Sequence, residues 1–89
     1  SVQFAENPDV HYPVRIRILA VDRYHLLIDI VDCITNGMHL SISSLHTTTT
    51  AEIVDCTVDV AVHSSHELQK VTRAIGGIAG VDEVMTLDI

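Results

Sequence analysis

Hydrophobic and polar residues alternate along residues 13–22 and 52–62, and this two-residue period predicts two β-strands. In the first strand one face carries Val14, Ile16, Ile18 and Ala20, and the other carries Arg15, Arg17, Leu19 and Val21. In the strand over 52–62 one face carries Val54, Cys56, Val58, Val60 and Val62, and the other carries Asp55, Thr57, Asp59 and Ala61. The two aliphatic faces are expected to pack in the core.

A period of three to four residues replaces the alternation between residues 25 and 37, which predicts a helix. The expected core-facing stripe is Leu27, Ile30, Val31 and Ile34, and the expected solvent face is Asp29, Asp32 and Asn36. Gly37 follows the stripe and is expected to end the helix in the left-handed conformation.

The remaining segments predict two more strands and a second helix. Residues 39–47 are expected to form a strand, followed by a threonine-rich loop at 47–50. Ser64 and Glu67 fit a capping box that starts a helix, whose buried stripe is Leu68, Val71 and Ile75 and which ends at Gly76-Gly77. Residues 81–89 complete the pattern as a last strand. Residues 1–11, in which Val2 and Phe4 alternate with polar residues, are a linker or a short edge strand.

The element order β-α-β-β-α-β predicts an α+β, ferredoxin-like fold. Right-handed crossovers place the first and third strands at the centre of a four-stranded antiparallel sheet, with both helices on one face. The other face brings Arg15 and Arg17 beside Asp55 and Asp59, with Leu19 among them. This mixed face, which a second copy of the chain is able to cover, predicts self-association.

Composition narrows the classes of function. The chain has 89 residues, 47% of them hydrophobic, so it forms one small domain. Its net charge of −7, with two Tyr, one Phe and no Trp, disfavours direct binding to nucleic acid. No apolar run is long enough to span a bilayer, and two distant cysteines fit the reducing cytoplasm. The opening Ser-Val-Gln, without Met, leads us to expect a piece of a longer protein.

The residue patterns predict neither catalysis nor a metal or other cofactor. Six histidines are present, but the closest pair, His63 and His66, spans a strand end and a helix start and lacks ligand spacing. Cys33 and Cys56 are expected to be buried, and no nucleophile elbow or phosphate loop is present.

Three segments carry a resemblance to a known family: YPVRIRILAVDR (12–23), LLIDIVDCITNGMHLSISSLHT (26–47) and GVDEVMTLDI (80–89). A strand, then D-R-x-G-L-L, a helix and a glycine-containing turn resemble an ACT domain, here spanning residues 12–89. Within that group the chain is most similar to the C-terminal ACT domain of RelA/SpoT enzymes, the bifunctional (p)ppGpp synthetase/hydrolases.

The resemblance implies a regulatory module that controls catalytic domains outside this chain, through contacts with another copy, the ribosome and tRNA, or other proteins. ACT domains also pair and bind small ligands, often amino acids, at the interface, so an amino-acid sensor in a homodimer is the alternative. The implied ligand residues are Asp22, Arg23, His25, Leu26, Asn36 and Gly37.

His25 stands where the family motif has glycine. Glycine there lets the backbone approach a ligand. The imidazole either plugs the pocket or replaces it with a pH-sensitive contact, and we favour plugging. Asp22 has a structural interpretation as well, as the cap of the first helix.

Overall fold

The structure, a computed structural model, describes residues 11–87 and confirms the predicted element order. The elements are β1 (Tyr12–Val21), α1 (Leu26–Asp32), the π-helical turn η1 (Cys33–Gly37), β2 (Ile42–Thr50), β3 (Ile53–Val62), α2 (Ser65–Gly76) and β4 (Val81–Leu87). The edge strand proposed around Val2 and Phe4, and the last two residues of the strand predicted over 81–89, lie outside the described residues.

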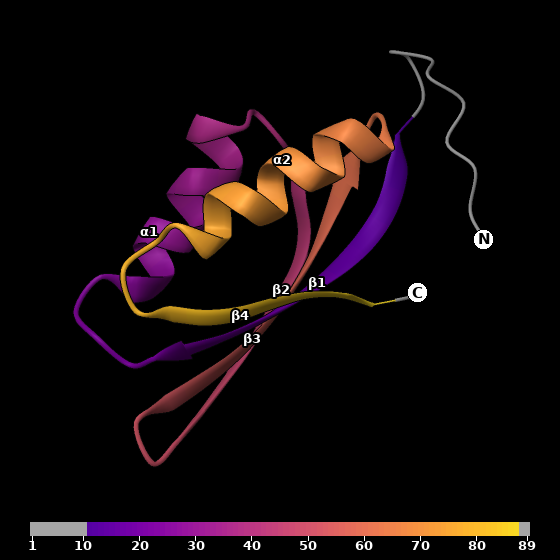
Figure 1. Ribbon diagram of the computed structural model, residues 1–89. Coiled ribbons are helices and arrows are strands. Elements are labelled where there is room, and N and C mark those ends of the chain that lie inside the picture. The colour runs from indigo at the N-terminus through magenta and orange to yellow at the C-terminus, as the bar shows by residue number, and fades with distance from the viewer. Residues whose placement is uncertain (1–10, 88–89) are drawn as a thin grey trace.

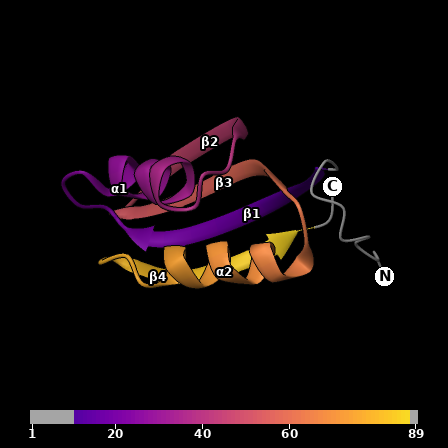
Figure 2. The same ribbon diagram turned by 90° about the horizontal axis from the view of Figure 1, so that it is seen from above.

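The four strands form one sheet in the order β2-β3-β1-β4, and each neighbouring pair is antiparallel. The prediction that the first and third strands are central is therefore confirmed. Both helices cover one face of this sheet, with α1 toward the β3 side and α2 toward the β4 side (Figures 1 and 2). The tip of the β2–β3 hairpin extends past the helices (Figure 1).

The core lies between the sheet and the helices and is almost wholly aliphatic. The predicted faces of β1 and β3 are buried as expected, because each second residue points toward the helices. The covering residues from the helices are Leu26, Ile30, Ile34, Val71 and Ile75. No polar or charged side chain is buried among the described residues.

The first helical segment matches its predicted range but differs in its last turn and in part of its buried stripe. It spans residues 26–37, close to the predicted 25–37, but only Leu26–Asp32 is α-helical and Cys33–Gly37 is a π-helical turn. The buried stripe is Leu26, Ile30 and Ile34, whereas Leu27 is 37% exposed. Both stripes satisfy a four-residue spacing, and only the position of the sheet decides which faces inward.

Two turn assignments were also wrong. Gly37 is the last residue of the π-helical turn without a left-handed backbone, and the left-handed residue is His39, with φ 57°. The threonines at 47–50 belong to β2, because β-branched residues suit a strand. The hairpin turns instead at Ala51 and Glu52, with φ 50° and 67°, the two positive values of a type I′ turn.

The predicted capping of α2 is confirmed, with one difference in detail. The Glu67 backbone N–H donates to Ser64 Oγ at 3.1 Å. The Glu67 carboxylate does not reach back to Ser64 itself but accepts from the His63 backbone N–H, at 2.7 Å, and contacts the His63 ring Nδ1 at 2.9 Å.

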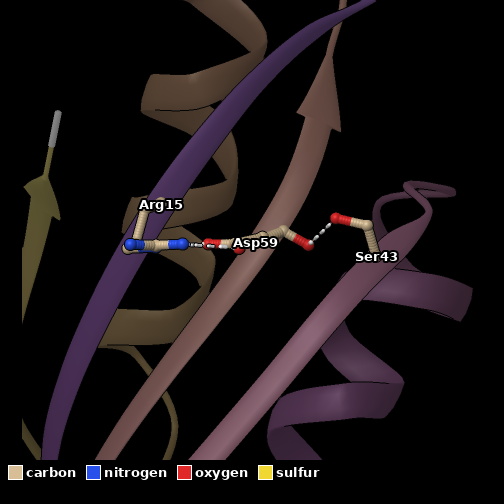
Figure 3. Close-up of polar contacts among 3 residues, drawn as sticks. All are labelled: Arg15, Ser43 and Asp59. Atoms are coloured by element: carbon tan, nitrogen blue, oxygen red, sulfur yellow. Dashed lines mark hydrogen bonds and ion pairs between the residues drawn. The ribbon is translucent and has the colours of Figure 1, made fainter. Parts of the chain in front are cut away.

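The open face of the sheet carries two arginine–aspartate pairs. Arg15 donates to both carboxylate oxygens of Asp59, at 2.7 and 3.0 Å, and Ser43 Oγ donates to the Asp59 carbonyl at 3.2 Å (Figure 3). Arg17 pairs with Asp55 in the same two-bond manner. The guanidinium groups hold the pKa of both carboxyl groups below their usual value. Both arginines are therefore paired with a carboxylate within the sheet.

Candidate ligand and partner site at the β1–α1 turn

Three loops meet at the end of the molecule where β1 stops. The Val21 backbone N–H donates to the Gly80 carbonyl, and the Asp22 N–H donates to the Glu52 carbonyl, both at 2.8 Å. The turn between β1 and α1 is thus anchored to the α2–β4 loop on one side and to the hairpin tip on the other.

His25 is the N-cap of α1 and has a left-handed backbone, with φ 63° and ψ 14°. This conformation gives a local reason for the glycine of the family motif, since only glycine adopts it without cost. The His25 ring is exposed and stacks on Tyr24, with 3.8 Å between ring centroids and 21° between the planes. The helix N-cap makes no side-chain hydrogen bond, so the interpretation of Asp22 as the cap was wrong.

Beside the turn lies an open hollow of about 280 Å³. It is lined by residues 22–28 with Thr49 and Val54. The structure therefore brings four of the six predicted ligand residues together at this hollow: Asp22, Arg23, His25 and Leu26. Leu26, however, is only 2% exposed and belongs to the core.

The Arg23 guanidinium is committed to the protein rather than to solvent. It donates from Nε to the Ala79 carbonyl at 2.6 Å, from Nη1 to the Tyr24 carbonyl at 2.7 Å, and from Nη2 to Asp29 Oδ2 at 2.8 Å. Each of its three nitrogen atoms thus has an acceptor within the domain.

Asn36 and Gly37 lie at the opposite end of the α1–η1 segment and do not line the turn hollow. Asn36 donates from Nδ2 to Asp32 Oδ1 at 2.6 Å. It lines a second hollow, of about 340 Å³, together with the outward side chains Leu27, Ile28 and Val31. Within one subunit the six predicted residues therefore form two separate groups.

An ACT domain model matches residues 8–85 of the chain. The chain belongs to the ACT domain family. Such domains are regulatory rather than catalytic, and they commonly form oligomers and bind small ligands. No curated protein matches this ACT domain.

Several solved structures share the fold of this ACT domain. The crystal structure of the ACT domain from the GTP pyrophosphokinase of Chlorobium tepidum has a TM-score of 0.77 at 18% identity, covering 88% of this chain and 100% of that one. A homoserine dehydrogenase from Thiobacillus denitrificans has a TM-score of 0.70 at 21% identity, covering 88% of this chain and 17% of that enzyme. The C-terminal domain of MgtC from Mycobacterium tuberculosis has a TM-score of 0.69 at 15% identity, covering 93% and 92%.

The ACT domain exposes apolar side chains around the turn that were not predicted as part of the site. Tyr24 is 83% exposed and Ile28 is 60% exposed. The signal was present as the run Leu26-Leu27-Ile28, because three successive apolar residues on a helix cannot all face one core. We define the α1 outer face as Tyr24, Leu27, Ile28 and Val31.

The part of the ACT domain that the structure describes shows no metal-ligand cluster and no membrane-spanning helix. Residues 11–87 hold no group of three or more His, Cys, Asp or Glu side chains placed to bind a metal ion. Among the helices of that same range, none is long and apolar enough to cross a membrane. Cys56 is buried as predicted, whereas Cys33 is only partly buried, so its predicted burial was wrong. Burial raises the pKa of both thiols, which lowers the fraction present as the reactive thiolate.

Proposed function

We propose that this ACT domain is the regulatory and interaction module of a cytoplasmic RelA/SpoT-family enzyme, a (p)ppGpp synthetase/hydrolase of the stringent response. It controls the catalytic domains of the parent protein through contacts with a second copy, with the ribosome and tRNA, or with other proteins. The resemblance of residues 12–89 and the likeness to the GTP pyrophosphokinase domain support this choice of parent.

The α1 outer face is the observation that carries an interaction role. Leu27 is 37% exposed, and Ile28 and Tyr24 are more exposed still. Contiguous exposed apolar side chains mark interaction sites on small proteins. A surface of this kind at the end of the domain suits recognition of another protein chain better than recognition of phosphate.

The neighbouring edge of the sheet supports pairing with a second copy. β2 is an edge strand of nine residues, ISSLHTTTT, without Asp, Glu, Lys, Arg or Pro. The opposite edge strand, β4, carries Asp82 and Glu83, whereas each edge strand has one register shift in its pairing with the neighbouring strand. Charged side chains protect sheet edges against pairing, so β4 has this protection and β2 lacks it.

Pairing on the α1 side also explains why the predicted ligand residues fall into two groups. If two α1 helices run antiparallel across a two-fold axis, Asn36 and Gly37 of one copy approach the turn of the other. The hollow at Asp22 and His25 is then completed by the partner. This arrangement favours the alternative function, an amino-acid sensor whose ligand binds at the homodimer interface through Asp22, His25, Asn36 and Gly37.

Sedimentation of the chain tests the interface. We expect wild type to form a dimer and Ile28→Asp to be monomeric, because a charge on the α1 outer face would be desolvated on pairing. Leu87→Asp is the matched control, since Leu87 is 37% exposed but lies on β4. A monomeric wild type, or equal effects of the two substitutions, contradicts pairing through α1.

Two further assays separate the proposed functions. The full-length parent is assayed for (p)ppGpp synthesis and hydrolysis, with and without Ile28→Asp. We expect the substitution to change the balance of the two activities, and a parent with neither activity refutes the stringent-response assignment.

A thermal-shift screen of the twenty amino acids, (p)ppGpp and GTP uses wild type and His25→Gly. Stabilisation of wild type supports the sensor, whereas stabilisation of His25→Gly alone supports a pocket plugged by the imidazole.

A further inference from the structure

One side chain, Arg23, connects two loops that lie 56 residues apart in sequence. From the β1–α1 turn it reaches the Ala79 carbonyl of the α2–β4 loop, with a bond of 2.6 Å from Nε. Its other two nitrogen atoms hold the Tyr24 carbonyl and the Asp29 carboxylate. The three bonds thus tie together the turn, helix α1 and the distant loop.

The loop is shaped to receive this side chain. Gly80 has a φ of +93°, and a Cβ at this position would lie 3.3 Å from Arg23 Nε and 3.4 Å from the Val21 carbonyl oxygen. Any larger residue would meet both a strained backbone and the stem of Arg23. The Gly80 carbonyl in turn accepts from the Val21 N–H, which closes a second connection between the same two segments.

The chemistry of the guanidinium makes this connection stiff. Its donors are fixed in one plane, so a shift of one acceptor changes the geometry of the bonds to the others. The Arg23 side chain is only 29% exposed, which limits the space in which it can rearrange. Lysine would retain the charge, but its single ammonium group does not reproduce three donors in fixed directions.

We propose that Arg23 is a positioning residue that latches the β1–α1 turn to the α2–β4 loop, so that a displacement of the turn is passed to Ala79, Gly80 and the start of β4. Arg23 lines the turn hollow, but its three nitrogen atoms are bonded within the domain, so it acts by holding the turn in place and not by binding a ligand. The identity of a molecule bound at the turn depends on the function proposed above. The latch, meaning the connection that Arg23 makes between the two loops, does not depend on it. A perturbation of the turn by mutation is sufficient to test it.

The test is amide hydrogen exchange, followed by NMR, on the isolated chain. The reporters are the Val21 amide, bonded to the Gly80 carbonyl, and the Val81 amide, bonded to the Ile78 carbonyl. We expect Arg23→Lys to speed exchange at both by about 5-fold or more, because local opening of the loop becomes easier. Arg15→Lys is the matched control, since it alters an arginine–aspartate pair on the open sheet face and should leave both reporters unchanged.

Coupling is measured by moving the turn in both backgrounds. His25→Gly removes the ring that stacks on Tyr24, whose carbonyl accepts from Arg23 Nη1. We expect this change to shift the Ala79 and Gly80 amide resonances in wild type but much less in Arg23→Lys. A merely structural arginine would lower overall stability without removing this response. Equal shifts in the two backgrounds, or no shift in wild type, overturn the latch.

A milder variant covers the case in which Arg23→Lys does not fold. Asp29→Asn weakens one of the three bonds at a side chain that is 46% exposed. We expect it to reduce the transmitted shift partially, and an unchanged shift contradicts the latch. Because no ligand or partner is added, these results are independent of whether the proposed stringent-response or sensor function is correct.

Discussion

The left-handed backbone of His25 leads to a prediction about the order of two substitutions. His25→Ala and His25→Gly both remove the ring that stacks on Tyr24, so the loss of this contact cancels when they are compared. Alanine keeps a Cβ at φ 63° and retains a left-handed cost of roughly 1–2 kcal/mol, whereas glycine does not. The glycine variant in turn loses about 0.5–1 kcal/mol of unfolding free energy, because glycine gives the unfolded chain greater conformational freedom.

The difference leaves His25→Gly more stable than His25→Ala by about 1 kcal/mol. Gln69 provides the control, because it is exposed in the body of α2. There the order should reverse, with Gln69→Gly less stable than Gln69→Ala by about 1 kcal/mol. The two comparisons then differ in sign and by about 2 kcal/mol in total.

Urea unfolding of the four variants measures these differences. The midpoint urea concentrations are compared while the dependence of the unfolding free energy on urea concentration is held the same. Thermal unfolding gives a second readout, since about 1 kcal/mol shifts the midpoint of a domain this small by about 4–8 °C. If alanine is the more stable residue at both positions, His25 does not have a left-handed backbone and the structural explanation of the family glycine is wrong.

Three other predictions test the core, the charged face and the thiols. Ile18→Ala should lower the free energy of unfolding by about 3 kcal/mol, because Ile18 is fully buried, and a loss below about 1 kcal/mol in urea unfolding would contradict that burial. Arg15 lowers the pKa of Asp59, so this pair adds stability above about pH 4 that is lost as the pH falls further. Urea midpoints at pH 5 and pH 2.5 should therefore differ less in Arg15→Gln than in wild type. Cys56 should react with a thiol reagent only after unfolding, while the partly exposed Cys33 reacts in the native state, and the number of thiols titrated with and without urea checks this.

The strands were predictable because their signal is local and repeated. Every second residue from Val14 to Ala20 is aliphatic, and β3 follows the same rule, so a period of two fixes both the element and its buried face. The crossover rule then places these two strands together without further information. The capping of α2 was equally local, since Ser64 and Glu67 lie three residues apart.

The turns and the site were less predictable because they depend on distant residues. The π-helical turn changes the spacing along η1, and no residue type signals it in advance. Arg23 matched a ligand motif, but its acceptor at Ala79 becomes a neighbour only after the whole chain has folded. The left-handed backbone of His25 was likewise hidden, although the glycine of the motif at that position pointed to it.

The pairing of β1 with β4 determines how the domain responds to a pulling force. The two strands are antiparallel, and Arg15 near the start of β1 lies opposite Leu87 at the end of β4. Tension applied through the two ends of the described chain therefore loads this ladder at one end. The hydrogen bonds between β1 and β4 would break one after another instead of sharing the force, so the domain should unfold at low force. In this mechanically weak domain, β4 separates first while β1, β2 and β3 remain paired.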